Sequence, residues 1–327
     1  MNQGLFSVRY SAVPEAMEDH FELCSGEHGA FLCVADGCGG LGSRRYPQLE
    51  NRTGASLAAE LTARAAAGWW QSASVFPDTR EQGQTCGDAL AERLHEALTA
   101  FSKAHPPAGT RIVGSMQREL PTTLCLAWSA AAAELGRRDV CFAWAGDSRG
   151  YVLDANGLHQ CTQDHLRGGL DPLSALYRDV PLSNLVWAGQ KPRLSLRRFR
   201  LQEPFVLAVA TDGVFGGLRT PMEMEMLLID TLLAAKTPEG WQRKLGTVLK
   251  KTANDDATLL VQVCGCKDME TLQQLFHSRR TALQKQYITP VRRNRGNMSF
   301  VEARWKEYRP AYQWMEERAN EPTDWRL

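Results

Sequence analysis

Four aspartates stand where an apolar, strand-like run breaks into glycine or a turn. They occur in VADGCGG, WAGDSRG, VATDGVF and ANDDATLL, at Asp36, Asp147, Asp212 and Asp255. A carboxylate at a strand end is held in a fixed direction, and a following glycine lets backbone, ion and solvent approach closely. Together with the acidic pair Glu18 and Asp19, these carboxylates would repel one another strongly unless cations neutralised them. The pattern therefore predicts a metal site.

The ligand types indicate which ions such a site would take. Carboxylate oxygens are hard ligands that suit Mg²⁺ or Mn²⁺, whereas zinc sites use histidine or cysteine. Cys264-Gly-Cys266 resembles half a zinc site, but no second cysteine pair or nearby histidine completes a tetrahedral set. The nine cysteines, an odd number placed mostly in apolar runs, indicate reduced core thiols instead of a disulfide framework.

Each acidic residue also has a purely structural interpretation. An Asp-Gly pair after a strand is most often a turn, so neither Asp36 nor Asp212 identifies a site by itself. Asp147 equally fits a hairpin turn in which Arg149 pairs with it. The acidic pair at residues 18–19 fits a solvated face or a helix start.

The composition excludes several classes of protein. The 327 residues, 43% hydrophobic and 23% charged, suffice for one large domain or two small ones. A formal net charge of +1 gives no sign of nucleic-acid or membrane binding. The first twenty residues contain no apolar signal core, and the longest apolar stretch, LCLAWSAAAAEL, is too short to span a bilayer. We therefore expect a cytoplasmic protein.

The elements that must position these carboxylates come in blocks. An apolar run at residues 30–35 predicts a strand, and residues 53–70 and 87–105 show helical spacing on either side of a polar loop. Four short strand-like runs follow between residues 122 and 162, with Asn156-Gly157 as a turn signal, and predict an antiparallel meander.

The later part of the chain continues this block pattern. Two strand-like runs cover residues 194–211, and a third covers 257–265. Thr220 followed by proline and by Glu223 predicts a capped helix start, and residues 238–251 predict a further helix. Strands and helices that do not alternate strictly are typical of an α+β sandwich.

Seven of these segments resemble the motifs of one family. EAMEDHF, VADGCGG, PTTLCLAW, FAWAGDSRGYVL, CTQDH, LAVATDG and NDDATLLV occur in the order and approximate spacing of the metal-dependent protein serine/threonine phosphatases, the PP2C or PPM family. The resemblance covers roughly residues 5–265 and implies a phosphatase domain over residues 1–266. It also implies a four-layer α-β-β-α sandwich, with two antiparallel sheets flanked by helices and two Mn²⁺ or Mg²⁺ ions between strand ends.

The resemblance further implies a role for each residue of the site. Asp36 would bridge the two ions, the carbonyl of Gly37 would bind one of them, and Asp212 and Asp255 would bind the other. Glu18 would reach a metal through water. Asp19 would position the nucleophilic water. Asp147 would bind an optional third ion, and this ion is less expected because Gly216 stands where a second ligand for it is common.

The implied reaction is hydrolysis of phosphoserine and phosphothreonine by attack of a metal-activated water. Its substrates would be phosphorylated proteins, and a cognate serine/threonine kinase would be a partner. A nucleotide phosphohydrolase is disfavoured because the chain lacks a phosphate-cradling GxxxxGK[ST] loop.

Two departures from the family pattern bear on this function. Pro14 stands where many members have an arginine that grips the substrate phosphate, which leaves Arg9, Arg44 or Arg45 to supply a guanidinium. Cys38 stands where some members have a histidine that protonates the leaving group. Pro14, together with the segment beyond residue 266, leaves open a second function, a catalytically weak module that senses phosphoproteins or acts as a scaffold. Residues 171–192 resemble a shortened flap, the region that shapes substrate access in the family.

The chain extends beyond the resemblance, over residues 267–327. Helical patterns cover residues 267–287 and run from Ser299 to near Arg318, while residues 279–296 carry six basic side chains and no acidic one. One interpretation is a linker and a helical pair packed on the catalytic domain through its aromatic residues, Trp305, Tyr308, Tyr312 and Trp314. The other is a docking element for a partner protein or an acidic surface.

Overall fold

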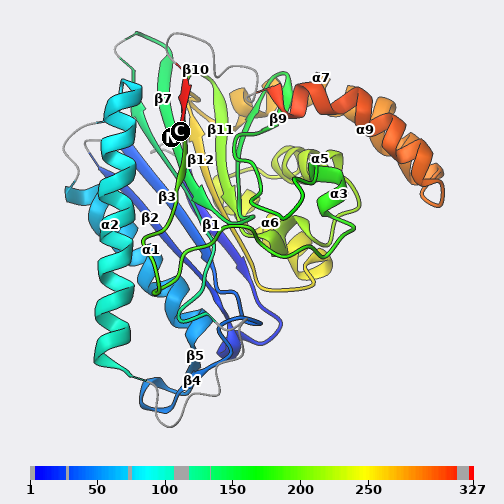
Figure 1. The fold of residues 1–327 in the computed structure, drawn as a ribbon. Helices are drawn as coiled ribbons and strands as arrows, with labels where there is room; N and C mark the ends of the chain where they lie inside the picture. Colours follow the sequence, from blue (N-terminus) through cyan, green and yellow to red (C-terminus); the bar gives the residue numbers. More distant parts are fainter. Residues whose placement is uncertain (1–3, 27–28, 73–75, 107–117, 133, 315–323) are drawn as a thin grey trace.

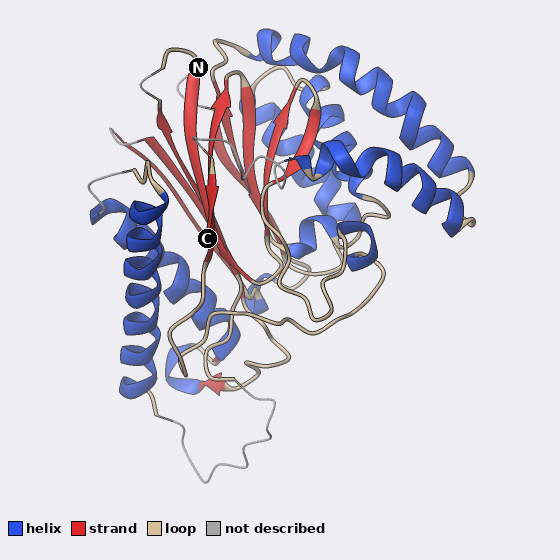
Figure 2. Cartoon of the chain, turned by 45° about the horizontal axis from the view of Figure 1, so that its top comes forward, coloured by secondary structure: helices blue, strands red, loops and turns tan. Residues whose placement is uncertain are grey.

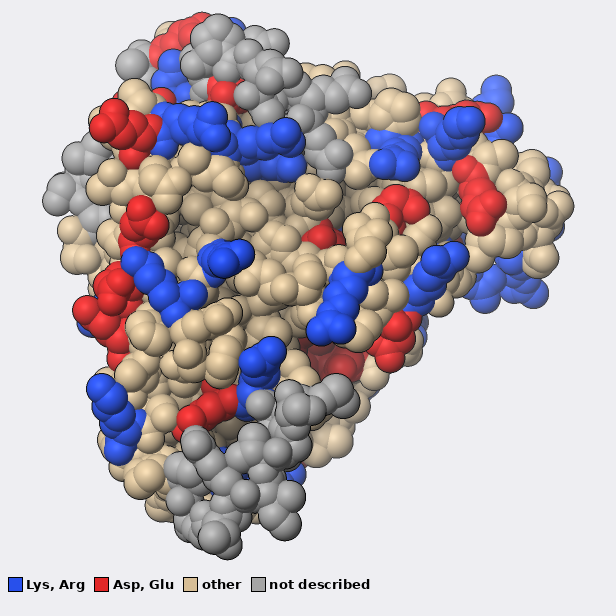
Figure 3. Space-filling model, viewed as in Figure 1, with Lys and Arg blue, Asp and Glu red and all other residues tan. Residues whose placement is uncertain are grey.

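Two antiparallel sheets lie face to face, and helices cover the outer face of each (Figures 1 and 2). This computed structural model describes residues 4–26, 29–72, 76–106, 118–132, 134–314 and 324–327. The predicted four-layer α-β-β-α sandwich is therefore confirmed. Lysines, arginines and acidic side chains are interspersed over the face seen in Figure 3.

Sheet B has six strands in the order β13-β10-β7-β6-β3-β2. Helices α1 (Gly54–Ser72) and α2 (Arg80–Ala104) cover its outer face, and their apolar side chains form one core cluster with it (Figure 1). The strands span β2 Asp19–Gly26, β3 Gly29–Asp36, β6 Leu124–Ala131, β7 Arg137–Ala145, β10 Ser195–Gln202 and β13 Trp325–Arg326.

Sheet A has five strands in the order β1-β12-β11-β8-β9. Helices α5 (Pro221–Leu233), α6 (Pro238–Thr252) and α7 (Met269–Leu283) pack with it in a second cluster. The strands span β1 Leu5–Tyr10, β8 Arg149–Asp154, β9 Gly157–Gln160, β11 Phe205–Ala210 and β12 Ala257–Cys264.

A third apolar cluster fills the space between the two sheets. The central strands are therefore buried on both faces, which explains why β11 (FVLAVA) and β12 (ATLLVQVC) are nearly continuous apolar runs without polar alternation. Such strands end abruptly where a polar residue first appears, and those ends carry the predicted aspartates.

The predicted four-strand meander is wrong. Strands β6 and β7 pair with each other in sheet B, whereas β8 and β9 pair in sheet A. The chain changes sheets at Gly146, which has a φ of +107°, and a Cβ there would lie 2.7 Å from the side chain of Thr123. A hairpin turn and a crossing between sheets both need glycine, so the pattern did not distinguish them.

The starts of three helices differ from the predictions in position or in capping contacts. Helix α2 begins at Arg80, inside the predicted loop, because Thr79 and Gln82 form a capping box among polar residues. Thr220 precedes α5 as predicted, but its side chain makes no capping bond, and Glu223 accepts from the amide of Arg219 instead. Helix α9 (Met298–Tyr312) is capped by Asn297 and not by Ser299.

The helices beyond β12 pack on the sheet A side of the sandwich. Helix α7 continues through η3 (Gln284–Ile288) into α8 (Thr289–Arg293), so most of the predicted linker at 279–296 is helical. In α9, Trp305, Tyr308 and Tyr312 are buried in the core cluster of sheet A, whereas Trp314 is 37% exposed. The end predicted near Arg318 lies outside the described residues.

The chain ends on the opposite sheet. Strand β13 pairs with β10 at the edge of sheet B, and Trp325 contributes to the core cluster under α1 and α2. The last residues are thus a strand where a helical extension was predicted. No helix among the described residues is both long enough and apolar enough to cross a membrane.

Candidate active site

Asp36 and Asp212 meet from facing sheets. Asp36 is the last residue of β3 in sheet B, and Asp212 opens the short helix α4 (Asp212–Phe215) directly after β11 of sheet A. Their carboxyl groups lie close enough to perturb each other's pKa. Burial, followed by the charges of Asp212, Asp19 and Asp147, raises the pKa of Asp36 well above its usual value. Burial also raises the pKa of Asp212, and the charge of Asp255 adds to this effect.

Asp19 is held rigidly beside this pair. It opens β2, stands opposite Asp36 in the β2–β3 register and is 4% exposed. Its Oδ2 accepts hydrogen bonds from the hydroxyls of Thr211 (2.8 Å) and Thr258 (2.7 Å). Burial raises the pKa of Asp19 to about 7 against these two hydrogen bonds. Its buried Oδ1 has no hydrogen-bond partner among the described residues, so this oxygen is available to a ligand or to water.

Glu18 is positioned by a hydroxyl, a carboxylate and a glycine. Its Oε1 accepts from Thr53 Oγ1 at 2.5 Å, and its backbone amide donates to Asp256 Oδ2 at 2.7 Å. A Cβ on Gly39 would lie 2.1 Å from Glu18 Oε2, so glycine at this position makes room for the carboxylate. Burial, followed by the charges of Asp256 and Asp255, raises the pKa of Glu18 against the bond from Thr53.

Gly37 and Asp255 complete the predicted ligand set. A Cβ on Gly37 would lie 2.5 Å from the backbone of Ala55, so its glycine is required for the close packing of α1. Asp255 is exposed at the rim of the site, and its charge acts on both Asp212 and Glu18. The six predicted acidic residues and Gly37 therefore all belong to one region.

Asp147 lines the same cavity as Asp212. Burial, followed by the charges of Asp212 and Asp164, raises the pKa of Asp147 to about 7. The predicted pairing of Arg149 with Asp147 is wrong, because Arg149 donates to both carboxylate oxygens of Asp164, with its shortest contact at 2.6 Å. Arg149 is 1% exposed and its guanidinium lies over the ring of Phe215, 4.1 Å from the centroid.

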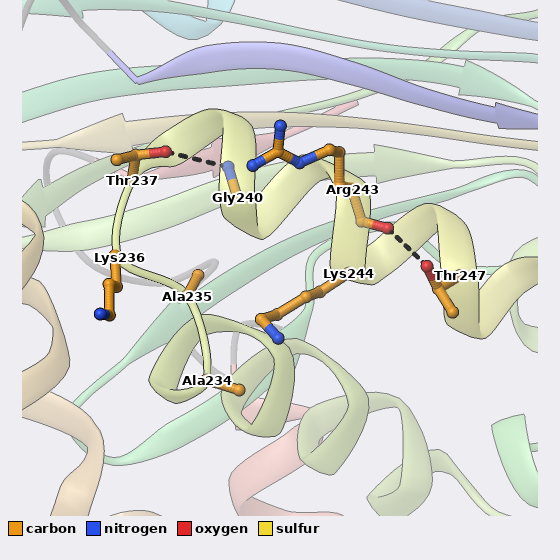
Figure 4. Close-up of a pocket in the computed structure, with 8 residues that line it drawn as sticks. All are labelled: Ala234, Ala235, Lys236, Thr237, Gly240, Arg243, Lys244 and Thr247. Carbon is orange, nitrogen blue, oxygen red and sulfur yellow. Dashed lines mark hydrogen bonds between the residues drawn. The ribbon is translucent and has the colours of Figure 1, made fainter.

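The acidic cluster opens into two cavities. A cavity of about 410 Å³ is lined by Glu18 and Asp255 together with Arg45. A second cavity, of about 380 Å³, is lined by Asp147 and Asp212 together with residues of the flap, including Tyr177, Arg178 and Asp179. A third cavity of about 410 Å³, at the junction of α5 and α6, contains none of the predicted acidic residues (Figure 4).

The three candidate phosphate-binding arginines differ in position. Arg9 donates to Met17 Sδ and to the carbonyl of Asp19, and Arg44 lies over the ring of Tyr46, 4.4 Å from its centroid. Arg45 instead lines the same cavity as Glu18, and its charge lowers the pKa of that carboxyl against the effect of burial. Arg45 is therefore the best placed of the three.

The donor chemistry fits divalent cations that prefer oxygen. The side chains brought together are carboxylates, and a buried oxygen of Asp19 has no hydrogen-bond partner among the described residues, as expected of a group that faces a ligand or ordered water. Among the described residues, no group of three or more His, Cys, Asp or Glu side chains is arranged to hold one ion as it stands.

Several residues of the site were missed from the sequence. The missed residues each contact a member of the site: Thr53 and Asp256 contact Glu18, Thr211 and Thr258 contact Asp19, and Asp164 pairs with Arg149. Only the adjacent acidic pair in NDDAT gave a signal for Asp256. Thr211 and Thr258 reach Asp19 across 192 and 239 positions of the chain, which no local pattern indicates.

The fold is shared with several solved phosphatases. Stp1 from Staphylococcus aureus, a serine/threonine phosphatase, superposes with a TM-score of 0.59 at 16% identity, over 80% of this chain and 96% of that one. The phosphatase MsPP from Mycobacterium smegmatis gives 0.55 at 17%, over 80% and 98%. The catalytic domain of PstP, in complex with two manganese ions, gives 0.53 at 18%, over 79% and 96%. At these identities the likeness establishes the fold alone.

Sequence comparison supplies the assignment that the fold cannot. No curated protein matches the chain. The profile of the family described as protein phosphatase 2C matches residues 13–250, more than two thirds of the sequence. This range contains Glu18, Asp19, Asp36 and Asp212. The chain therefore belongs to the protein phosphatase 2C family.

Proposed function

We propose that the chain is a metal-dependent phosphatase that removes phosphate from phosphoserine and phosphothreonine in proteins. The observation that carries this proposal is the meeting of Asp36 and Asp212 at facing strand ends, next to the buried Asp19, whose Oδ2 is hydrogen-bonded and whose Oδ1 has no partner among the described residues. Six carboxylates in one region are unfavourable without cations, and burial together with the charges of neighbouring carboxylates raises the pKa of five of them: Glu18, Asp19, Asp36, Asp147 and Asp212.

The ligand set follows from this placement. Asp36, Asp212, Asp255, Glu18 and the carbonyl of Gly37 would hold two divalent cations, Mn²⁺ or Mg²⁺. When bound, such cations lower the pKa of a coordinated water and neutralise the charge that develops on the phosphate. The two manganese ions in the complex of the PstP catalytic domain support this proposal.

The chain's own residues orient the reactants. Asp19, fixed by Thr211 and Thr258, presents Oδ1 as a hydrogen-bond acceptor for the attacking water. Arg45 would take the place of the missing arginine at Pro14 and bind the phosphate from the side of Glu18. Asp147 would bind an optional third ion.

The partners follow from the same proposal. Phosphorylated proteins are its substrates, and a serine/threonine kinase would supply them. The exposed basic side chains Arg292, Arg293 and Arg295 near α8 remain candidates for docking an acidic partner. The second candidate function, a catalytically weak phospho-sensing or scaffold module, is favoured by Pro14 alone.

Hydrolysis of an aryl phosphate and of a phosphothreonine peptide tests the proposal. We expect Mn²⁺-dependent turnover that a chelator abolishes, and a loss of at least about 100-fold in Asp36→Asn and Asp212→Asn, because each removes a charged ligand. Asp88→Asn, an exposed substitution on α2, is the control and keeps full activity. A wild-type rate no higher than that of the ligand variants, combined with retained phosphopeptide binding, would instead support the scaffold function.

A further inference from the structure

The N-terminal half of the flap (residues 171–192) belongs to a closed loop over one of the two cavities of the site. This loop, residues 166–182, leaves and rejoins the body at a bridge between Leu166 and Leu182, reinforced by the bond from the Arg167 amide to the Pro181 carbonyl at 3.0 Å. Within this flap, Tyr177 and Arg178 line the cavity that contains Asp147 and Asp212. The position of the flap therefore determines the shape of that cavity.

Asp171 organises the flap from its N-terminal half. It caps the short helix α3 (Pro172–Ala175), accepting from the amides of Leu173 at 3.1 Å and Ser174 at 3.4 Å and from the Ser174 hydroxyl at 2.5 Å. The same carboxylate accepts a fourth hydrogen bond, at 2.8 Å, from the indole N–H of Trp305 in α9. This bond connects the flap to a residue 134 positions further along the chain.

Trp305 is fixed in place on the other side of this bond. It is 5% exposed, and its ring packs edge-on against Tyr312 with centroids 5.4 Å apart. Leu173 of the flap lies in the same core cluster as Trp305, so apolar packing accompanies the hydrogen bond.

Helix α9 is anchored independently of the flap. Tyr308 donates to Glu225 Oε2 at 2.5 Å, and Arg279 donates to both oxygens of the same carboxylate at 2.6 and 2.9 Å. Glu225 lies on α5 and is fully buried. Charge-assisted hydrogen bonds of this kind are strong in a buried setting, so α9 is a fixed support against which the flap is held.

We propose that Trp305 is a positioning residue through which α9, outside the matched phosphatase range, sets the flap and with it the entry of phosphoprotein substrates. This inference rests on the proposed function. With its phosphate held on the Glu18 side, a protein substrate is large enough to contact the flap at the neighbouring cavity of Asp147 and Asp212, whereas a small aryl phosphate is not. Loosening the flap therefore affects protein substrates selectively.

Two variants break the same bond from opposite sides. Trp305→Phe keeps an aromatic ring but removes the indole N–H, and Asp171→Ser keeps a helix-capping side chain that is too short to reach Trp305. Tyr308→Phe is the matched control, since Tyr308 also lies on α9 and its variant loses a buried hydrogen bond to a carboxylate, that of Glu225, without touching the flap.

The first measurement, which does not depend on activity, is how readily a protease cleaves the flap. We expect tryptic cleavage after the exposed Arg178 to accelerate about tenfold in Trp305→Phe and Asp171→Ser, as expected for loss of one hydrogen bond to a carboxylate. Tyr308→Phe lowers the melting temperature but leaves cleavage at Arg178 at the wild-type rate. Equal cleavage in all proteins would overturn the inference, and because this assay needs no turnover, that result is distinct from a failure of the proposed function.

Kinetics then test the effect on substrates. With a phosphothreonine peptide, we expect both flap variants to raise KM severalfold while kcat stays within about twofold, and with an aryl phosphate we expect no change. Tyr308→Phe keeps wild-type KM for both substrates. A KM rise shared by the control, or an equal loss with the aryl phosphate, would show a merely structural role and overturn the inference.

Discussion

Thr211 and Thr258 both donate to Oδ2 of Asp19, but their replacement by valine has different consequences. Thr258→Val removes one hydrogen bond, of 2.7 Å, to the carboxylate. Thr211→Val removes the bond of 2.8 Å to the same oxygen and also the acceptor of the Thr258 amide, which donates to Thr211 Oγ1 at 2.9 Å. Both threonines are fully buried, so water does not replace the lost partners.

The expected free energies follow from these contacts. A hydrogen bond to a charged group contributes about 1.5–3 kcal/mol, so Thr258→Val should lower the free energy of unfolding by that amount. Thr211→Val leaves a buried amide without a partner as well, which adds about 1–3 kcal/mol. The difference between the two variants is thus about 1–3 kcal/mol, with Thr211→Val the less stable.

Urea unfolding in the presence of a chelator measures both variants, with tryptophan fluorescence as the signal. The assay is run at pH 8, above the Asp19 pKa of about 7, where its carboxylate is charged. Since this pKa is raised on folding, Asp19 itself favours the folded state at low pH, and its contribution declines as the pH rises from 3.8 to about 7. At pH 5 the carboxyl is neutral and the loss in Thr258→Val should shrink to about 0.5–1.5 kcal/mol. Equal stability of the two variants at pH 8, or a loss that does not depend on pH, would refute the reasoning about Asp19.

Three further predictions concern the ligand, the flap and the C-terminal helices. Gly39→Ala should weaken Mn²⁺ binding at least about tenfold in a calorimetric titration, because its Cβ would lie 2.1 Å from Glu18 Oε2. Gly40→Ala is the control and should bind normally, because its Cβ would have nothing within 4 Å. Equal affinities of the two variants would contradict the placement of Glu18. Burial raises the pKa of Asp171, but the hydrogen bonds to its carboxylate outweigh this and lower it, so Asp171 stabilises the folded flap above the ordinary pKa of 3.8, and this stabilisation is lost as the pH falls further. Hydrogen exchange of the α3 amides, corrected for intrinsic rates, should therefore rise below that pH. Unchanged protection at pH 2 would contradict this prediction. Glu225→Gln should lower the free energy of unfolding by about 3–5 kcal/mol in urea, because it leaves the partner guanidinium on α7 without a charged acceptor; a loss below 1 kcal/mol would show that this contact is not an effective ion pair.

The sequence predicted the strand-end carboxylates because their signal is local. An apolar run that stops at Asp-Gly marks both the end of a buried strand and a rigid carboxylate, as at Asp36 and Asp212. Most strands were predicted for the same reason, since burial on both sheet faces gives continuous apolar runs, and the long helices were predicted from apolar residues at helical spacing. The resemblance to a known family brought these local signals together into one site.

The remaining features depend on contacts between distant residues. Asp256 supports Glu18 across 238 positions of the chain, and Thr258 reaches Asp19 across 239. Arg149 had acidic neighbours on both sides in sequence, and only the path of β8 shows that Asp164 is its partner. The π-helical turn that joins α7 to α8 likewise lies in a basic stretch whose composition indicates a linker.

The role of the last sixty residues was also undecided at the level of sequence. The same aromatic residues fit a packed helix and a docking surface, and burial of Trp305, Tyr308 and Tyr312 shows the first of these for α9. A domain boundary at residue 266 stays a prediction, and the contacts of α9 with α5 and of β13 with β10 are where it can be tested.

Calorimetric titration of the metal-free protein with Mn²⁺ tests the central claim most directly, namely that carboxylates from both sheets converge to hold divalent cations. We predict saturable binding of two ions per chain in the wild type and the loss of at least one in Asp36→Asn, with Asp88→Asn unchanged. No binding to the wild type, or undiminished binding to Asp36→Asn, would contradict the account.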